Sequence, residues 1–134
     1  MNVILDTNIL ISAITLGGKP GLILDLAVEQ RILAFTSETL IIELKGVLIN
    51  KFKYSPQRLN QIENTLHEHF TIAHPTKVPS VISRDPDDNH VLAITHMVDI
   101  DYIISGDKDL FILGSYNKTL IINPAEFLER YSRP

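Results

Sequence analysis

The sequence predicts an α/β fold with three α/β/α layers, built on a parallel sheet of about four or five strands. Short apolar runs typical of buried strands alternate with longer segments of helical periodicity. Hydrophobic residues make up 45% of the 134 residues, which is enough for a core without disulfides or a structural metal. Strands that alternate with helices favour a parallel sheet with helices on both faces. Because no linker or repeat divides the chain, we expect residues 1–134 to form a single domain.

The first half of the chain is predicted to contain three strands and four helices. Aliphatic residues at 2–5 indicate a buried strand that stops at Asp6. Helices are expected at 9–16 and 21–30, separated by a turn at 17–20. After a strand at 32–36, the Ser37 hydroxyl is expected to cap a helix that runs to about residue 50. Ser55 and Pro56 begin a helix to about residue 70, which precedes a strand at 71–74.

The second half is predicted to contain two strands and two helices. Asp85 and Pro86 form a favourable helix start, with an aspartate cap and a proline at the first helical position, so a helix is expected over 85–98. Strands are expected at 102–105 and 119–122, and a closing helix at 124–131.

Composition excludes several classes of protein. A net charge of −4 argues against a general nucleic-acid coat, which would be basic. The absence of cysteine excludes disulfides, thiolate nucleophiles and cysteine-based metal centres. No apolar run is long enough to span a bilayer, and Asp6 and Asn8 interrupt the N-terminal apolar stretch, which no basic residue precedes. We therefore expect a cytoplasmic protein that does not associate with membranes.

Acidic residues are concentrated in one part of the chain. Seven of the nine aspartates lie between positions 85 and 109: Asp85, Asp87, Asp88, Asp99, Asp101, Asp107 and Asp109. Carboxylates this close to one another repel unless a cation or a basic group lies among them.

Four carboxylates are placed to meet at one edge of the predicted sheet. Asp6 and Asp107 each follow a predicted strand, and ligands of parallel sheets bind beyond the carboxyl ends of the strands. Glu43 lies on the apolar stripe of its own helix, where an unpaired carboxylate is costly. Asp88 lies three residues before Val91, on the face turned toward the sheet. Such a cluster predicts a hard divalent cation, Mg²⁺ or Mn²⁺.

Each of these acids also has a simpler explanation when it is taken alone. An aspartate after a strand is a common turn former, and Glu43 can reach water from the border of its stripe. Asp85 and Asp87 suit the first turn of a helix, whose dipole favours negative charge. Four acids from four different elements at one edge are harder to explain as independent turns and caps.

Four motifs together resemble the PIN-domain family of ribonucleases, which includes the toxin subunits of VapBC-type toxin–antitoxin pairs. Residues 3–8 (VILDTN) are similar to the family's opening motif, and residues 43–44 (EL) to the acidic position of its third helix. Residues 84–93 (RDPDDNHVLA) resemble the third motif, and residues 104–110 (ISGDKDL) the fourth. The motifs follow the family's order over nearly the whole chain.

The resemblance implies a metal-dependent endoribonuclease that hydrolyses RNA phosphodiester bonds and leaves 5′-phosphate and 3′-hydroxyl ends. It implies one or two Mg²⁺ or Mn²⁺ ions, a homodimer and a small antitoxin protein as partner. The implied catalytic and metal-binding residues are Asp6, Glu43, Asp88 and Asp107. Residues implied to support these ligands or to contact the substrate are Asn8, Ser105, Asp87 and Asp109. Whether Asp87 or Asp88 is the ligand of the third motif stays open.

Other functions remain open from the sequence: a housekeeping RNA-processing nuclease, a DNA 5′-nuclease, or a non-catalytic module whose acidic pocket binds a basic peptide. A haloacid-dehalogenase-type phosphatase fits less well, because Asn8 stands where its second aspartate belongs. The five histidines are expected to lie at the surface or partly packed, without a chelating pair. The basic stretch formed by Lys45, Lys51, Lys53 and Arg58 is expected to be solvated surface, with contact to an RNA backbone as the alternative.

Overall fold

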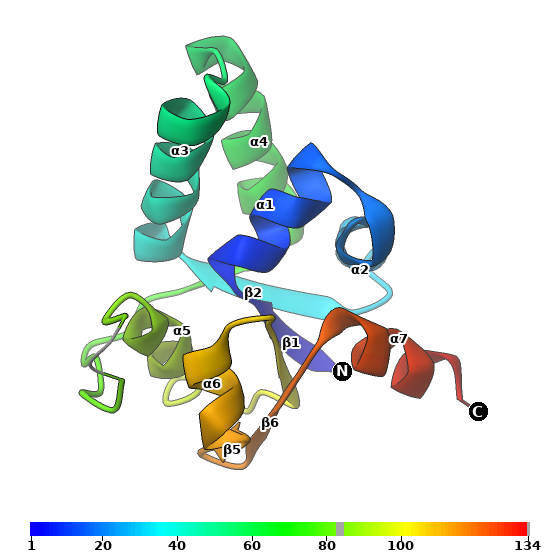
Figure 1. Ribbon diagram of the computed structural model, residues 1–134, viewed down its shortest axis with the longest axis vertical. Helices are drawn as coiled ribbons and strands as arrows, with labels where there is room; N and C mark the ends of the chain where they lie inside the picture. Colours follow the sequence, from blue (N-terminus) through cyan, green and yellow to red (C-terminus); the bar gives the residue numbers. More distant parts are fainter. Residues whose placement is uncertain (83–84, 134) are drawn as a thin grey trace.

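The computed structural model describes residues 1–82 and 85–133, which form an α/β sandwich with helices on both faces of one sheet (Figure 1). The strands in these ranges are β1 (Asn2–Leu5), β2 (Leu33–Ser37), β3 (Thr71–Ala73), β4 (Tyr102–Ile104), β5 (Ser115–Tyr116) and β6 (Thr119–Ile122). The helices are α1 (Thr7–Thr15), α2 (Gly18–Val28), α3 (Glu38–Phe52), α4 (Pro56–His69), α5 (Asp88–Ile94), α6 (Lys108–Leu113) and α7 (Pro124–Ser132).

The sheet has the strand order β3-β2-β1-β4-β6-β5, and β1 lies in its interior, between β2 and β4. All pairs except β5 with β6 are parallel, which confirms the predicted architecture. The described sheet has one strand more than the four or five expected, because β5 adds a short antiparallel strand. The turn between β5 and β6 holds Asn117 and Lys118 at φ 50° and 67°. Hairpin turns with two positive φ values match the strand twist, but Lys118 gives no sequence signal for one.

Successive side chains of the central strands enter two different cores. Val3 and Leu5 of β1 belong to the core beneath α1, α2, α3, α4 and α7, whereas Ile4 belongs to the core beneath α5 and α6. The same alternation holds for Ile103 and Ile104 of β4. Each strand is therefore apolar on both faces, which explains why its sequence is a continuous apolar run.

Two helix boundaries near the strand ends differ from the prediction. α1 begins at Thr7 instead of residue 9, because Asp6 accepts the Ile9 N–H at 2.8 Å and caps the helix directly after β1. α5 covers Asp88–Ile94 instead of 85–98, because the chain before it forms turns closed by three-residue hydrogen bonds, such as Asp88 N–H to the Asp85 carbonyl at 3.0 Å. The prediction of Asp85 as the helix cap is therefore wrong.

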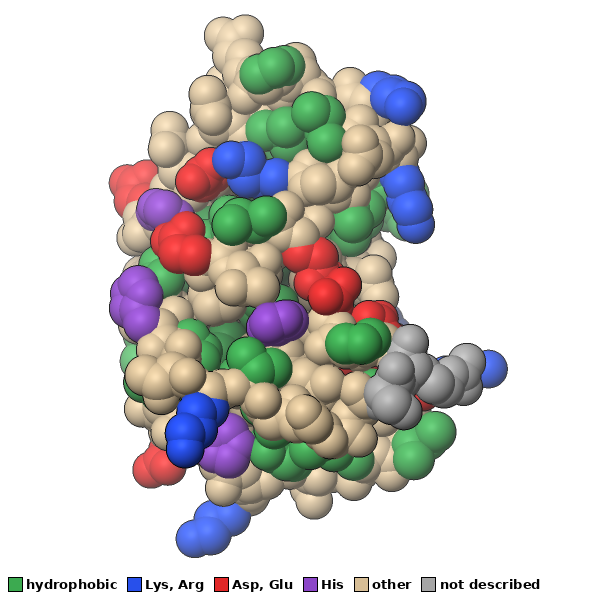
Figure 2. Space-filling view, turned by 90° about the vertical axis from the view of Figure 1, so that its left-hand side faces the viewer, with side chains coloured by type: hydrophobic (Ala, Val, Ile, Leu, Met, Phe, Trp, Pro, Cys, Tyr) green, Lys and Arg blue, Asp and Glu red, His purple; other side chains and the backbone are tan. Residues whose placement is uncertain are grey.

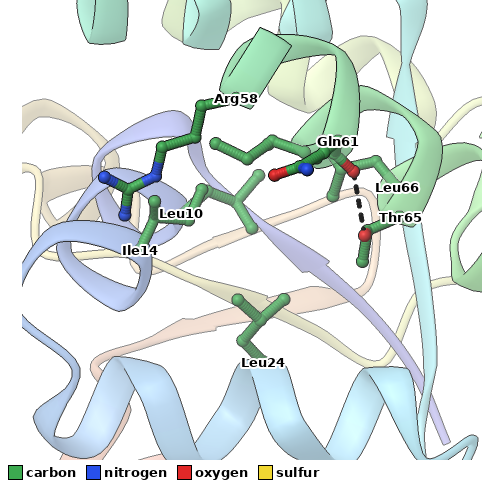
Figure 3. A pocket seen from close by; sticks show the side chains of 8 residues that line it. Leu10, Ile14, Leu24, Arg58, Gln61, Thr65 and Leu66 are labelled. Atoms are coloured by element: carbon green, nitrogen blue, oxygen red, sulfur yellow. Dashed lines mark hydrogen bonds between the residues drawn. The ribbon is translucent and has the colours of Figure 1, made fainter. Parts of the chain in front are cut away.

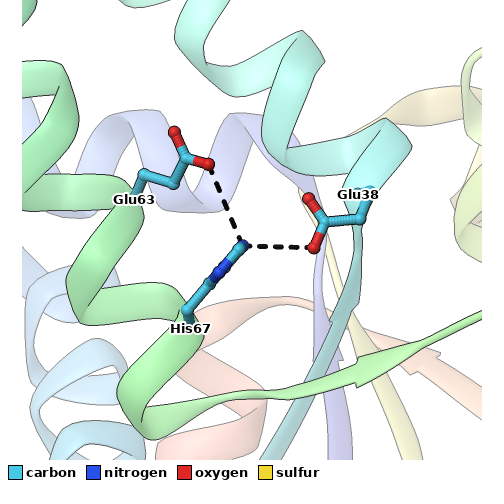
Figure 4. A group of neighbouring side chains, drawn as sticks. All are labelled: Glu38, Glu63 and His67. Carbon is cyan, nitrogen blue, oxygen red and sulfur yellow. Dashed lines mark ion pairs between the residues drawn. The ribbon is translucent and has the colours of Figure 1, made fainter.

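The long helices α3 and α4 pack together through a cluster of charged side chains (Figure 4). His67 Nε2 of α4 lies 3.1 Å from a Glu38 carboxylate oxygen of α3 and 4.0 Å from Glu63. Lys45 of α3 pairs with the other oxygen of Glu63, and this contact lowers the pKa of the Glu63 carboxyl. His67 therefore contacts carboxylates from two helices, an arrangement that helical spacing along α4 alone did not reveal.

The cap of α3 provides a stability prediction for the helix that carries Glu43. Ser37 is buried, and its hydroxyl accepts the Leu40 N–H at 3.3 Å. Replacing Ser37 by alanine leaves that N–H without its cap, so we expect a loss of about 1 kcal/mol in the free energy of unfolding. Urea denaturation of Ser37→Ala measures this loss, with the exposed Ser132→Ala as the control. A change in midpoint no larger than that of the control would contradict the assignment of this cap.

In the described part of the chain, no single helix is long and apolar enough to cross a membrane. α1 and α2 reach the length and apolar composition of a membrane span only when they are taken together, and the chain bends by 101° between them.

Candidate metal-binding active site

Asp6 and Asp107 meet at the carboxyl ends of β1 and β4 through a shared hydroxyl group. Ser105, which is buried, donates its hydroxyl hydrogen to Asp6 and accepts the Asp107 N–H at 2.9 Å. One oxygen of Asp107 also accepts the N–H groups of Asp109 and Leu110, at 2.8 and 3.2 Å, and so caps α6. Both acids are thus held in fixed positions by strand-to-helix turns.

Asp6 is almost inaccessible to water, with 3% of its surface exposed. Burial raises the pKa of its carboxyl to about 6, although hydrogen bonds from Ser105 and the Ile9 N–H oppose the rise. The negative charge of Asp107 adds to it. A carboxylate that is both buried and close to another acid is costly unless a cation offsets its charge.

Asp88 is the most strongly perturbed acid in the cluster. It is 9% exposed, and burial raises the pKa of its carboxyl to about 8, with the facing Asp107 carboxylate as the next cause. Its Oδ2 atom is buried and has no hydrogen-bond partner among the described residues. Oxygens of Asp85, Asp88 and Asp107 lie within 4.8 Å of one another, close enough to share one ion.

Glu43 approaches the cluster from α3. Burial raises the pKa of its carboxyl, the hydroxyl of Thr7 opposes this rise, and the charges of Asp87 and Asp85 add to it. Glu43 and residues near the starts of α1 and α5 line a small polar hollow of about 60 Å³. Its lining residues are Asp6, Thr7, Asn8, Glu43, Asp85, Asp87, Asp88 and Val91. Acidic side chains gather toward the middle of the right-hand side of the face in Figure 2.

The eight residues expected at the site divide into three groups by position. Asp6, Glu43 and Asp88 line the hollow, and Asp107 reaches the same cluster through Asp88 and Ser105. Asn8 and Asp87 also line the hollow, whereas Asp109 contributes its backbone N–H to Asp107. Arg84 of the third motif lies outside the described residues.

Two polar residues that line the hollow, and the apolar Val91, were not predicted as parts of the site. Asp85 was interpreted as a helix cap, yet its carboxylate shares the cluster with Asp88 and Asp107. Thr7 belongs to the opening motif, but no role in the site was predicted for it; it lines the hollow and faces Glu43. The acidic content of residues 85–88 pointed to Asp85, but only the turn geometry shows which of these acids face the cluster.

A second hollow, which is apolar, lies between α1, α2 and α4 and measures about 210 Å³ (Figure 3). Leu10, Ile14 and Leu24 form its floor, and Arg58 lies at its rim. The Arg58 guanidinium stacks 4.2 Å from the centre of the Tyr54 ring. Of the basic stretch, Arg58 and Lys45 are therefore already engaged with neighbouring side chains of this protein.

The residues of the acidic hollow suit a hard cation. Among the described residues, every charged side chain that lines it is a carboxylate, the ligand type that Mg²⁺ and Mn²⁺ prefer. The buried Oδ2 of Asp88 has no hydrogen-bond partner in the described part of the chain, whereas a buried polar atom normally has one, and a metal ligand has no need of it. The raised pKa values of Asp6, Glu43 and Asp88 have the same origin, negative charges buried side by side.

This combination of fold and acidic edge defines a PIN domain, and the chain belongs to the PIN-domain family, whose model matches residues 2–109. Along its sequence the chain is similar to an uncharacterized protein of Methanocaldococcus jannaschii, with 33% identity over 99% of this chain and 93% of the relative. Its fold is similar to the crystal structure of FitAcB from Neisseria gonorrhoeae, with a TM-score of 0.52 and 14% identity over 92% of this chain and 98% of the other.

Proposed function

We propose that this protein is a metal-dependent endoribonuclease that uses Mg²⁺ or Mn²⁺ to hydrolyse RNA phosphodiester bonds. Membership of the PIN-domain family supports a nuclease. The observation that supports the metal dependence is the convergence of Asp6, Glu43, Asp88 and Asp107, where a buried Asp88 oxygen finds no hydrogen-bond partner among residues 1–82 and 85–133.

In this proposal the four acids hold one or two ions and do not themselves attack the phosphate. When bound, the metal supplies Lewis acidity, water activation at neutral pH and attraction for the phosphate that the carboxylates alone would repel. The Ser105 hydroxyl holds Asp6 and Asp107 next to each other, and the N–H groups at the start of α6 orient the Asp107 carboxylate. Asn8 and Asp87 line the same hollow, from where they reach the bound phosphate or the ligands.

The biological setting proposed here follows from the resemblance of the four motifs to toxin subunits. We propose that the protein is the toxin of a toxin–antitoxin pair, that it acts on RNA in the cytoplasm and that it forms a homodimer. Its antitoxin is expected to be a small protein that covers the acidic hollow, with an arginine or lysine that neutralises the carboxylates in place of metal. Growth arrest on expression of the protein alone, relieved by co-expression of the small protein encoded next to it, tests this setting.

The activity is tested by incubating the purified protein with labelled single-stranded and hairpin RNAs. Cleavage is expected with Mg²⁺ or Mn²⁺ and is expected to stop when a chelator is added, because the proposed reaction depends on the bound ion. The products are expected to carry 5′-phosphate ends. Cleavage of DNA but not RNA would instead support the DNA 5′-nuclease. Metal binding without cleavage of RNA or DNA would instead support the non-catalytic module.

Metal binding is also expected to stabilise the folded protein. An ion that binds only the native state stabilises it by about 2.7 kcal/mol at a concentration one hundred times its Kd. Thermal unfolding with increasing Mn²⁺ is expected to show a rising Tm, and Asp6→Asn is expected to abolish the rise. A basic peptide that raised the Tm while Mn²⁺ had no effect would contradict the proposal and favour the binding module.

A further inference from the structure

Asn89 is a buried polar residue that the proposed chemistry does not use. It follows Asp88 in α5, is 5% exposed and uses both ends of its amide. Its Oδ1 atom accepts the N–H groups of Val81 and Ile82, at 3.2 and 2.9 Å, and its Nδ2 donates to the Ile82 carbonyl at 2.7 Å. Three hydrogen bonds thus join one side chain to two consecutive backbone units.

The two backbone units held by Asn89 lie just before the acidic turn. Ile82 precedes Asp85 by three residues, and its side chain is buried in the core beneath α5. From Asp85 the chain turns back to Asp88 through the hydrogen bond between the Asp88 N–H and the Asp85 carbonyl. Asn89 therefore holds the chain at residues 81–82 against the start of α5, three residues before Asp85.

The acidic turn brings two carboxylates close to that of Asp107. Asp85 reaches Asp88 and Asp107 within 4.8 Å, although the mutual repulsion of three acids would drive the turn away from the cluster. The Asp85 side chain accepts a local hydrogen bond from the Asp87 N–H at 3.2 Å. The two hydrogen bonds between Asn89 and Ile82 are buried, where hydrogen bonds are strongest and a missing partner is most costly.

We propose that Asn89 is a positioning residue for the metal site: by holding residues 81–82 against α5, it keeps Asp85 and Asp88 together as metal ligands. The inference rests on the proposed function, because it assigns Asn89 a role in the same site. It also makes Asp85 a member of the ligand set rather than a helix cap.

The test compares Mn²⁺ binding by wild type, Asn89→Ala and Asn89→Asp, measured by calorimetry with Mn²⁺ alone. Asn89→Ala removes all three hydrogen bonds, and we expect its half-saturating Mn²⁺ concentration to rise at least about 10-fold, the usual range for residues that orient metal ligands. Asn89→Asp keeps the two acceptor contacts and loses only the bond to the Ile82 carbonyl. Its affinity is expected to lie between the other two, although an added negative charge by itself would favour a cation.

Asn117→Asp is the matched control, because Asn117 Nδ2 donates to the Thr95 carbonyl at 2.9 Å away from the acidic hollow. This variant loses one amide-to-carbonyl hydrogen bond, as Asn89→Asp does, and its Mn²⁺ affinity is expected to match wild type even where its Tm falls. Mn²⁺ affinity of Asn89→Ala within twofold of wild type would overturn the inference. If that variant does not fold, an affinity of Asn89→Asp equal to wild type overturns it. Absence of Mn²⁺ binding by wild type would instead refute the proposed function itself.

Discussion

Replacing Asp6 or Asp88 by asparagine is expected to lower the rate of RNA cleavage at saturating Mg²⁺ by at least about 1,000-fold, equivalent to about 4 kcal/mol in the activation barrier. Asparagine is almost the same size as aspartate, so the hollow keeps its shape while one negative ligand is lost. Asp6 lies between the strand end and Ser105, and Asp88 faces Asp107. Loss of either proposed ligand is expected to displace the ion on which the proposed reaction depends.

The matched control is Asp25→Asn on α2, an exposed aspartate that lies apart from the acidic hollow. This variant makes the same chemical change and is expected to cleave RNA at the wild-type rate. Single-turnover assays on all three variants give the comparison. Equal rates for wild type and Asp6→Asn would show that the activity belongs to a contaminant.

Without metal, the protein is expected to become less stable as the pH rises from about 4 to 8. Asp6 and Asp88 have pKa values of about 6 and about 8 in the folded protein, raised from 3.8, so the native state holds protons that the unfolded chain has released. The contribution of these two carboxyls to the free energy of unfolding is complete below their unfolded pKa of 3.8. It is lost as the pH rises through their folded pKa values of about 6 and about 8. For Asp6 the shift corresponds to about 3 kcal/mol. The acids that face Asp88 and contribute to the effect are Asp107 and Asp85.

Asp88→Asn is expected to remove much of this penalty, because an uncharged amide replaces the buried charge and can donate a hydrogen bond to the facing Asp107. With chelator present at pH 8, its Tm is expected to exceed that of wild type by at least about 5 °C. At pH 4, where Asp88 is protonated, the difference is expected to vanish. A Tm of Asp88→Asn at or below that of wild type at pH 8, with Asp25→Asn as control, would show that Asp88 is not under electrostatic strain.

Much of the fold followed from the sequence because both faces of the central strands are buried. The continuous apolar runs at β1, β4 and β6 identify strands, and the strand–helix alternation determines their parallel direction. The convergence of Asp6 and Asp107 followed from that topology alone, since parallel neighbours end at the same edge. The apolar stripe of α3 pointed to Glu43 as a candidate, with a carboxylate that reaches water from the border of the stripe as the alternative.

The parts that could not be predicted depend on contacts between distant segments. Asp85 was interpreted as a cap because its local sequence suits one, but in the structure a turn closed by the Asp88 N–H and the Asp85 carbonyl precedes α5. The side chain of Asn89 holds residues 81–82 against the start of that helix, a contact that the local sequence does not show. α6 was not predicted, because its short sequence resembles a loop until Asp107 is seen to cap it. Ser105 was expected to support the site, but the sequence did not show that its hydroxyl contacts both Asp6 and Asp107. The hydrogen bond from Ser105 to Asp6 joins residues 99 positions apart.

The two outer strands of the described sheet are short, with three residues in β3 and two in β5. An extended segment of another chain that added itself to either edge would gain only a few backbone hydrogen bonds, far fewer than along a strand of ordinary length. The antiparallel turn of β5 also ends the parallel ladder on that side. The molecule is thereby protected against edge-to-edge aggregation, and protein partners are left to bind through side chains of its helices and loops.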